Sequence, residues 1–393
     1  MKTYPVKFYT HTMQGAPQVS EDSAAGQLAA LLKAVLVDGF GTLVPDSIVW
    51  DATELSAKAS FSSGHAYEID SIVLLEGVSP SDYNGEHRIV KLEGNDVWFE
   101  LDDGVTPANA SAVGTMKVAP LGWELTHADA NNEILIFKPA GDLGNVSLRI
   151  DNSAFVGWSG TYARFAQVEM VEDVVDVDNY TLIYNHRWAC TDRYSTGGWD
   201  LVGDNRIFYY LTKYGAGNEF GGYVAGYIDT VRAGDKYHFI MNNVGSTNAS
   251  DGTYSRWDQV ASAYLYYNYF LANGQTTQNR IARKYHQLEG GDSWKKRGMG
   301  SRGSDLFNYP DLATNGFYIN VEPQVVQEGD NTLRGYMPIL VEPLANATVL
   351  YRKNLQDLPE HPNKIFRMLL STYDRRSDLA STLCGFDIST VEV

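Results

Sequence analysis

Cysteine is scarce in this sequence, since its 393 residues include only Cys190 and Cys384. Two thiols so far apart fit neither a disulfide framework nor a tetrahedral metal site, whose ligands lie at close spacing. Long apolar runs are also missing, and no stretch approaches the roughly 20 residues that a helix needs to cross a bilayer. We therefore expect a soluble protein with two buried thiols in a reducing compartment and without a secretion signal.

Common catalytic signatures are missing too. The sequence contains no Gly-x-Ser-x-Gly elbow, no His-Glu-x-x-His motif and no Gly-Lys-Ser/Thr phosphate loop. Basic residues are outnumbered, because 31 lysines and arginines stand against 48 acidic residues and give a formal charge of −17. Such a surface repels nucleic acid and anionic membranes. We expect no enzyme, no cofactor, no membrane contact and no general nucleic-acid binding.

One acidic run resembles a possible cation site. Carboxylates clustered on a turn can coordinate Ca²⁺, but this run lacks the glycine and the bidentate glutamate of a calcium loop. A solvated acidic face is the simpler interpretation, and we predict no metal. The run consists of Glu169, Glu172, Asp173, Asp176 and Asp178.

The residues that are abundant indicate a mainly β protein. The chain has 25 tyrosines, eight tryptophans and 36 glycines, and aromatic residues fit pleated strands while glycine forms turns and bulges. One amphipathic helix is expected after residues 20–23 and before Gly39, and we expect it to lie on a small sheet. Its apolar positions at helical spacing are Leu28, Leu31, Leu32, Val35 and Leu36.

Short strands separated by turn residues follow this helix. We predict an N-terminal helix plus small β-module over residues 1–120, with strands at 69–75, 87–92 and 97–101. A Tyr/Trp-rich, sandwich-like antiparallel domain is expected over 121–290, with strands that include 134–137, 146–150, 161–171, 206–212, 222–228 and 236–241. Residues 291–393 are expected to combine a basic, glycine-rich loop within 288–308 and strands at 316–321, 336–341, 347–351, 364–373 and 384–388, completing the second domain.

A local reversal of charge marks the segment from residue 280 to residue 302. Its seven basic residues face two acidic ones, in a chain that is acidic overall. We interpret it as an arm that reaches an acidic patch on a neighbouring subunit. An equally good alternative is a flexible, solvated loop that pairs with the acidic remainder of its own chain. The candidate interface residues are Arg280, Arg283, Lys284, Lys295, Lys296, Arg297 and Arg302.

Several motifs occur in an order that resembles tailed-bacteriophage virion proteins. Gly64-His65 precedes a strand, Pro80 and Asn84-Gly85 fix a turn, and residues 97–101 close the unit, as in a small β-module of those proteins. The helix after Pro17 and the later segment 333–340 are similar to uncharacterised phage structural proteins. The resemblance implies residence in the virion after synthesis in the host cytoplasm, as a head, neck or tail component, without an established active site.

Two functions from different classes follow. The first is a structural component of the head-to-tail region or tail, which forms homo-oligomers and binds other phage structural proteins through aromatic and apolar interfaces. The alternative is a host-recognition protein, a tail fibre or receptor-binding protein, whose exposed aromatic rings stack on surface glycans. The candidate stacking residues are Trp188, Trp199, Tyr209, Tyr210, Tyr223 and Trp257.

Overall fold

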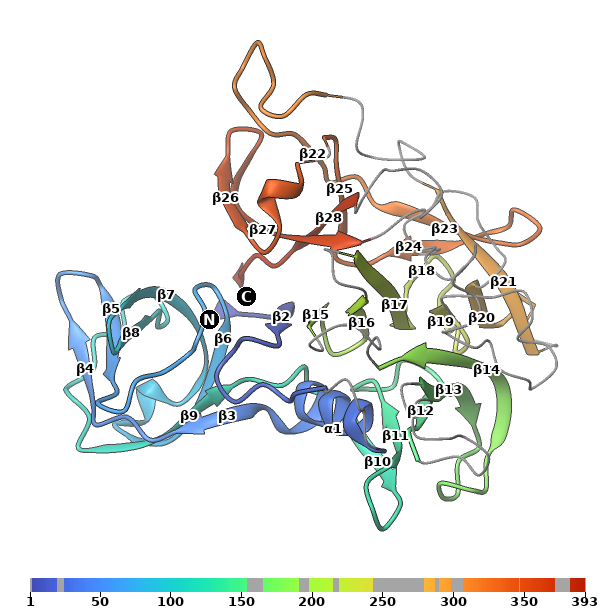
Figure 1. The fold of residues 1–393 in the computed structure, drawn as a ribbon, viewed down its shortest axis with the longest axis horizontal. Coiled ribbons are helices and arrows are strands. Elements are labelled where there is room, and N and C mark those ends of the chain that lie inside the picture. Colours follow the sequence, from blue (N-terminus) through green and yellow to red (C-terminus); the bar gives the residue numbers. More distant parts are fainter. Residues whose placement is uncertain are drawn as a thin grey trace.

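The protein is mainly β, as the composition predicts, and its strands form several antiparallel sheets. The structure is a computed structural model, and it describes residues 2–19, 25–153, 165–190, 198–214, 219–242, 279–286, 290–297, 307–345, 347–371 and 382–392. Figure 1 shows the sheets grouped around the two chain ends, which lie close together. They are joined by the short pairing of β1 (Lys2–Thr3) with β29 (Val391–Glu392).

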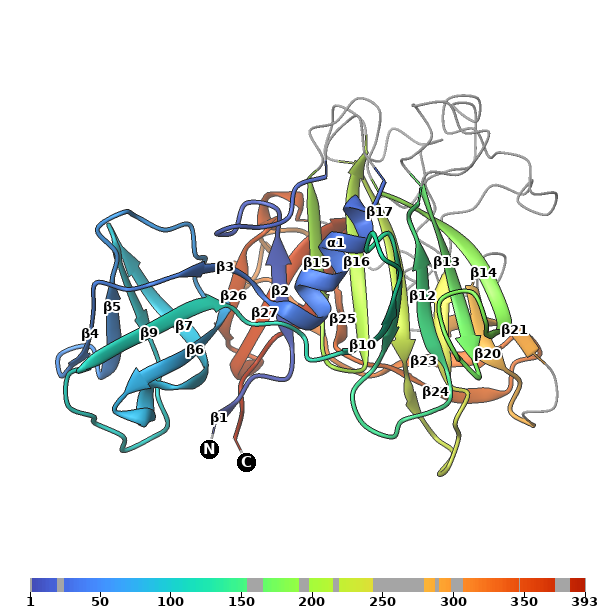
Figure 2. The same cartoon turned by 90° about the horizontal axis from the view of Figure 1, so that it is seen from below.

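The N-terminal lobe is a seven-stranded sheet that stands to one side of the molecule (Figure 2). In spatial order its strands are β3 (Phe40–Leu43), β9 (Ala112–Val118), β6 (Ile72–Ser79), β7 (Gly85–Glu93), β8 (Asp96–Phe99), β5 (Ser56–Ser60) and β4 (Ser47–Asp51). The turn predicted at Pro80 and Asn84-Gly85 lies between β6 and β7. The Asn84 side chain closes it by accepting the backbone N–H of Val78 and donating to the Val78 carbonyl, at 2.8 Å each.

The central sheet has ten strands and draws them from both halves of the chain. The N-terminal strand β2 (Lys7–Thr10) forms one edge by pairing with β15 (Trp199–Gly203). The remaining strands follow in the order β16 (Ile207–Tyr214), β17 (Glu219–Tyr227), β19 (Phe239–Asn242), β20 (Asn279–Arg283), β21 (Gly290–Arg297), β23 (Gln324–Glu328), β24 (Leu333–Met337) and β18 (Asp229–Thr230).

Two five-stranded sheets accompany the central sheet. The β10–β14 sheet contains β10 (Glu124–Ala128), β11 (Ile134–Lys138), β12 (Ser147–Asp151), β13 (Phe165–Glu172) and β14 (Thr181–Ala189). The C-terminal sheet has the order β22 (Ile319–Asn320), β25 (Leu340–Pro343), β28 (Thr382–Asp387), β27 (His361–Ser371) and β26 (Asn354–Leu358).

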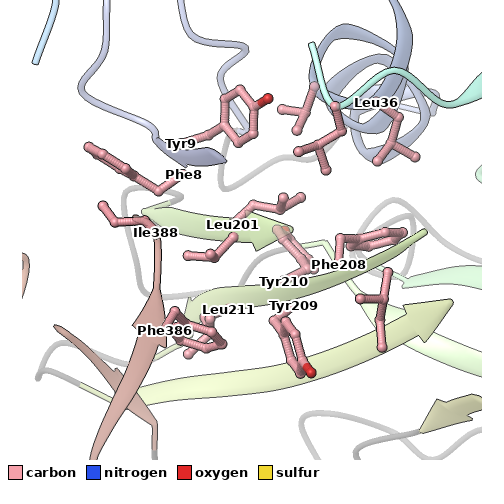
Figure 3. Close-up of a cluster of buried hydrophobic side chains, with 14 of the residues drawn as sticks. Phe8, Tyr9, Leu36, Leu201, Phe208, Tyr209, Tyr210, Leu211, Phe386 and Ile388 are labelled. Carbon is pink, nitrogen blue, oxygen red and sulfur yellow. The ribbon is translucent and has the colours of Figure 1, made fainter. Parts of the chain in front are cut away.

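Side chains on both faces of the central sheet are covered, as Figure 3 shows around β15 and β16. On one face Phe208 packs edge-on against Trp123 and Trp188 at centroid distances of 5.4 and 5.9 Å. On the other face Tyr209 lies 5.1 Å from Phe386 of the C-terminal sheet. A strand that is buried on both faces needs apolar side chains at consecutive positions, which explains the sequence Ile-Phe-Tyr-Tyr-Leu at 207–211.

The expected helix is present. It comprises α1 (Gln27–Lys33) and the π-helical turn η1 (Ala34–Asp38), and it ends at Gly39 with φ 70°. Its leucines are fully buried. Asn152 at the end of β12 accepts the N–H of Leu28 through its side chain at 2.8 Å. The helix therefore lies against the five-stranded β10–β14 sheet, which it meets at the end of β12 and at β10. Residues 20–23 lie outside the described residues.

Three strand and loop predictions are wrong. Residues 347–351 form the 3₁₀ turn η4 (Thr348–Leu350), because local backbone bonds close it and Val349 faces solvent. The predicted strand 336–341 is interrupted at Pro338 and Ile339, between β24 and β25. Part of the expected loop 288–308 is the strand β21, whose Trp294 is fully buried.

A short 3₁₀ turn, η2 (Ser81–Tyr83), precedes β7, where the turn residues Pro80 and Asn84-Gly85 predict a turn.

Candidate functional site

The basic segment is not a projecting arm in the part that the structure describes. Arg280 and Arg283 lie in β20, and Lys295 and Lys296 lie in the paired strand β21. Backbone pairing of β20 with β19 and of β21 with β23 fixes both strands inside the central sheet. The predicted projecting arm is therefore wrong for these residues. Arg302 and the side chain of Arg297 lie outside the described residues.

The cationic side chains of this segment contact their own chain. The Arg283 guanidinium donates to the Glu172 carboxylate and lies 4.1 Å from the Tyr237 ring centroid. Arg280 lies 4.9 Å from the centroid of the Tyr184 ring. The Lys295 ammonium donates to the Gly329 carbonyl at 3.1 Å, and Lys284 is half-buried beside β20. The flexible, solvated loop of the second interpretation is therefore also wrong for these residues, although the pairing of Arg283 with Glu172 agrees with its expectation of contacts inside the chain.

Lys296 is the most deeply buried of these cations. Its side chain is almost fully covered, and its ammonium donates to Gln324 Oε1 at 3.1 Å. Burial lowers the pKa of Lys296 to about 8, and the attraction of Glu342 opposes that shift only in part. The native state therefore binds fewer protons here than the unfolded chain between pH 8 and the ordinary lysine pKa of about 10.4.

This shift predicts a pH dependence of stability. Because the pKa of Lys296 is lower in the folded state, its contribution to the unfolding free energy rises with pH. Relative to a Lys296→Met variant, the wild-type chain should gain about 2 kcal/mol between about pH 7 and about pH 10. Urea titrations of both proteins across this range measure the difference. An identical pH dependence in the two proteins would show that Lys296 is not desolvated.

The candidate glycan-stacking rings are core residues. Trp188, Trp199, Tyr209 and Tyr210 are 0% exposed and Tyr223 is 1% exposed. Their polar atoms are also engaged inside the protein, since Trp188 Nε1 donates to the Asn242 carbonyl and Tyr209 Oη donates to the Pro338 carbonyl. A ring without exposed area cannot stack on a sugar, so the prediction fails for these five. Trp257 lies outside the described residues.

The acidic run does not gather around one point. The Glu169 carboxylate accepts from Arg149 at 2.9 Å and from the Tyr180 hydroxyl at 2.9 Å. Glu172 turns to Arg283, and Asp176 accepts from the Asn179 amide at 2.8 Å. Within the described part of the chain, no three His, Cys, Asp or Glu side chains are arranged to hold a metal ion. Likewise, no described helix is long and apolar enough to cross a membrane.

The most distinctive surface feature was not predicted. Residues 307–318, here named the knob, stand clear of the body as the uppermost orange segment of Figure 1. Leu312 near the apex is 89% exposed, and Phe307 and Tyr309 are 46% and 41% exposed. Large apolar side chains at these exposures on a single projection are typical of a contact site.

The side chains of the knob bond and pack with one another. Asp311 Oδ1 accepts the backbone N–H groups of Ala313 and Thr314 and the Thr314 hydroxyl, each at 3.0 Å. These bonds hold the pKa of Asp311 below its usual value. Two ring contacts, Tyr309 with Phe317 at 5.5 Å and Phe307 with Tyr318 at 5.2 Å, brace the stem. A preorganised projection loses little conformational entropy when it binds.

The knob is also anchored to the C-terminal sheet. The Phe307 N–H donates to the Leu344 carbonyl at 3.1 Å, and the Leu344 N–H donates to the Tyr318 carbonyl at 3.0 Å. Both ends of the knob are therefore tied to the end of β25. This attachment fixes the direction in which the knob projects.

A groove of about 260 Å³ lies where β24 passes into β25. At its centre the Leu340 N–H donates back to the Pro338 carbonyl at 2.7 Å, which closes a γ-turn at Ile339. The φ of Ile339 is 71°, a value that costs a β-branched residue about 1–3 kcal/mol. The lining of the groove is mainly apolar and includes Val321, Met337, Ile339 and Val341. Two carboxylates, Asp229 and Asp387, also line it.

The rest of the chain keeps this strained turn in place. Tyr209 Oη donates to the Pro338 carbonyl at 2.7 Å, and the Asp387 N–H donates to the Ile339 carbonyl at 2.9 Å. Strain that is held from both sides in this way is common at contact and ligand sites. The β24–β25 groove and the knob are thus two candidate interaction surfaces within the described part of the chain.

The sequence matches no family model and no curated protein. The knob and the groove therefore stand on their own geometry. The knob does have a sequence signal, because the turn-forming pairs Pro310-Asp311 and Asn315-Gly316 flank the three residues Leu312, Ala313 and Thr314. The groove has no comparable signal, since Ile339 with positive φ depends on contacts from distant strands.

Proposed function

We propose that this chain is a structural component of a tailed-bacteriophage virion, in the head-to-tail region or tail, and that it acts through protein–protein interfaces. The observation that carries the interface part is the knob: a rigid projection that exposes Phe307, Tyr309 and Leu312 to solvent. Aromatic and large apolar side chains are enriched in the buried parts of interfaces. The virion part rests on the ordered motifs of residues 64–101 and 333–340.

The distribution of charge supports a role in which this chain acts as part of an assembly. A formal charge of −17 keeps unassembled copies apart in solution. The knob carries only one charged side chain, Asp311, which is already bonded to Thr314. An exposed apolar projection on an otherwise acidic surface favours a partner that offers an apolar socket.

The glycan-binding alternative has no support in the described residues. It required exposed rings, and the five described candidates are buried. We therefore do not propose it.

Mass spectrometry of purified particles tests the proposal. Particles of the phage whose genome encodes this chain would be disassembled gently, and heads and tails separated. We expect the chain in one of these fractions, and specifically in necks or tails. Its absence from washed, infectious particles would contradict the proposal.

A further inference from the structure

We infer that the knob of one copy occupies the β24–β25 groove of a second copy, so that the chains associate head to tail. This inference rests on the proposed function, since it names the partner of the same projecting surface. The contact pairs two different surfaces of one chain, and is therefore heterologous. A heterologous contact generates a ring when its rotation closes and an open filament when it does not.

The two surfaces match in chemistry. The knob presents Leu312 at its apex with Phe307 and Tyr309 behind it. The groove offers Val321, Met337, Ile339 and Val341 in a volume of about 260 Å³, which admits a large apolar side chain. Val321 is 42% exposed at present, so a seated leucine would remove apolar area from water on both copies.

The carboxylates of both surfaces are already bonded to other side chains, which matters because copies of an acidic chain repel one another. Both carboxylates of the groove are already compensated: Asp229 accepts from Arg206 at 2.7 Å, and Asp387 accepts from Lys364 at 2.7 Å. The single carboxylate of the knob, Asp311, is bonded to Thr314. Knob and groove are thus places where two copies of a −17 chain can approach with little charge repulsion.

In this structure the knob does not occupy the groove of its own chain, because none of its residues lines that groove. The backbone bonds between Leu344 and both Phe307 and Tyr318 tie the knob to the end of β25 and direct it away from the body (Figure 1). The groove lies at the other end of the same strand, at Leu340 and Val341. The groove therefore stands open to the knob of a second molecule.

Two variants, one for each surface, test the inference in the full-length protein. Leu312→Asp places a carboxylate at the apex of the knob, and Val321→Asp places one in the groove. Both residues are exposed, so the fold should be retained, and thermal unfolding of each variant verifies this. Leu55→Asp is the matched control, because Leu55 is 75% exposed in the turn between β4 and β5 of the N-terminal lobe. Sedimentation velocity over a concentration series measures association.

The wild-type chain and Leu55→Asp should associate, while each of the other two variants should bind itself at least about 30-fold more weakly. An equimolar mixture of Leu312→Asp with Val321→Asp is the decisive sample. One intact knob and one intact groove remain in that mixture, so it should form heterodimers and nothing larger.

Three results would overturn the inference: a monomeric wild type at every concentration, association that survives Leu312→Asp, or a mixture that stays monomeric. The proposed function is judged separately by the presence of the chain in purified particles. A monomeric wild type that is nevertheless found in particles would refute head-to-tail self-association and leave the structural role standing.

Discussion

Replacing Arg334 by leucine should lower the free energy of unfolding by about 3–5 kcal/mol. Arg334 is 0% exposed and holds two buried carboxylates. Its Nε and Nη2 donate to Asp235 at 2.8 and 3.0 Å, and Nη1 donates to Glu328 and to the Arg283 carbonyl. Leucine would fill part of the space but leave both carboxylates buried without a cation, and burying an uncompensated charge is expensive.

Urea unfolding at neutral pH measures this loss. The control is Lys33→Met, which removes an exposed ion pair with Asp38 at 2.7 Å on the helix surface. Exposed pairs contribute about 0–1 kcal/mol, so the control should be nearly as stable as the wild type. Equal stabilities for Arg334→Leu and the control would mean that water reaches Asp235 and Glu328.

Replacing Trp188 by alanine should cost a similar 3–5 kcal/mol. Trp188 extends from β14 toward the central sheet, stacks on Tyr223 at 5.0 Å and meets Phe208 edge-on at 5.9 Å. Its Nε1 donates to the Asn242 carbonyl at 2.9 Å. Alanine would remove these contacts, open a cavity between two sheets and leave that carbonyl without its donor.

The same experiment separates a core role from a sugar-binding role. Tyr285→Ala is the comparison, because Tyr285 is 41% exposed and its loss should cost less than about 1 kcal/mol. We expect Trp188→Ala to unfold at much lower urea than Tyr285→Ala. A Trp188→Ala protein of wild-type stability would contradict the burial of this ring.

The sequence predicted where strands and the helix lie along the chain better than it predicted which elements pack against one another. Alternation and turn residues located the strands that became β7, β8, β11 and β12, and helical spacing located the buried leucines of α1. The sequence did not predict that the central sheet is covered by other sheets on both of its faces. Tyr209 and Tyr210 point to opposite faces of one strand, and both are buried because separate sheets pack on each face.

The candidate surfaces show the same limit. The excess of basic residues over 280–302 was visible in the sequence, but the pairing of Arg283 with Glu172 depends on β13 reaching β20 across more than a hundred residues of chain. Conversely, the knob contains ordinary turn residues whose exposure depends on the anchor to Leu344. Local patterns report which residues can form a turn or strand, whereas tertiary contacts decide which of them remain at the surface.

The copy number of this chain in intact particles tests the central claim most directly. Quantitative mass spectrometry with isotope-labelled peptides, normalised to the major capsid protein, measures it in washed infectious particles. A structural component predicts a constant whole number of copies per particle, set by the symmetry of the site that it occupies. A trace amount that varies between preparations, or complete absence, would contradict the structural role.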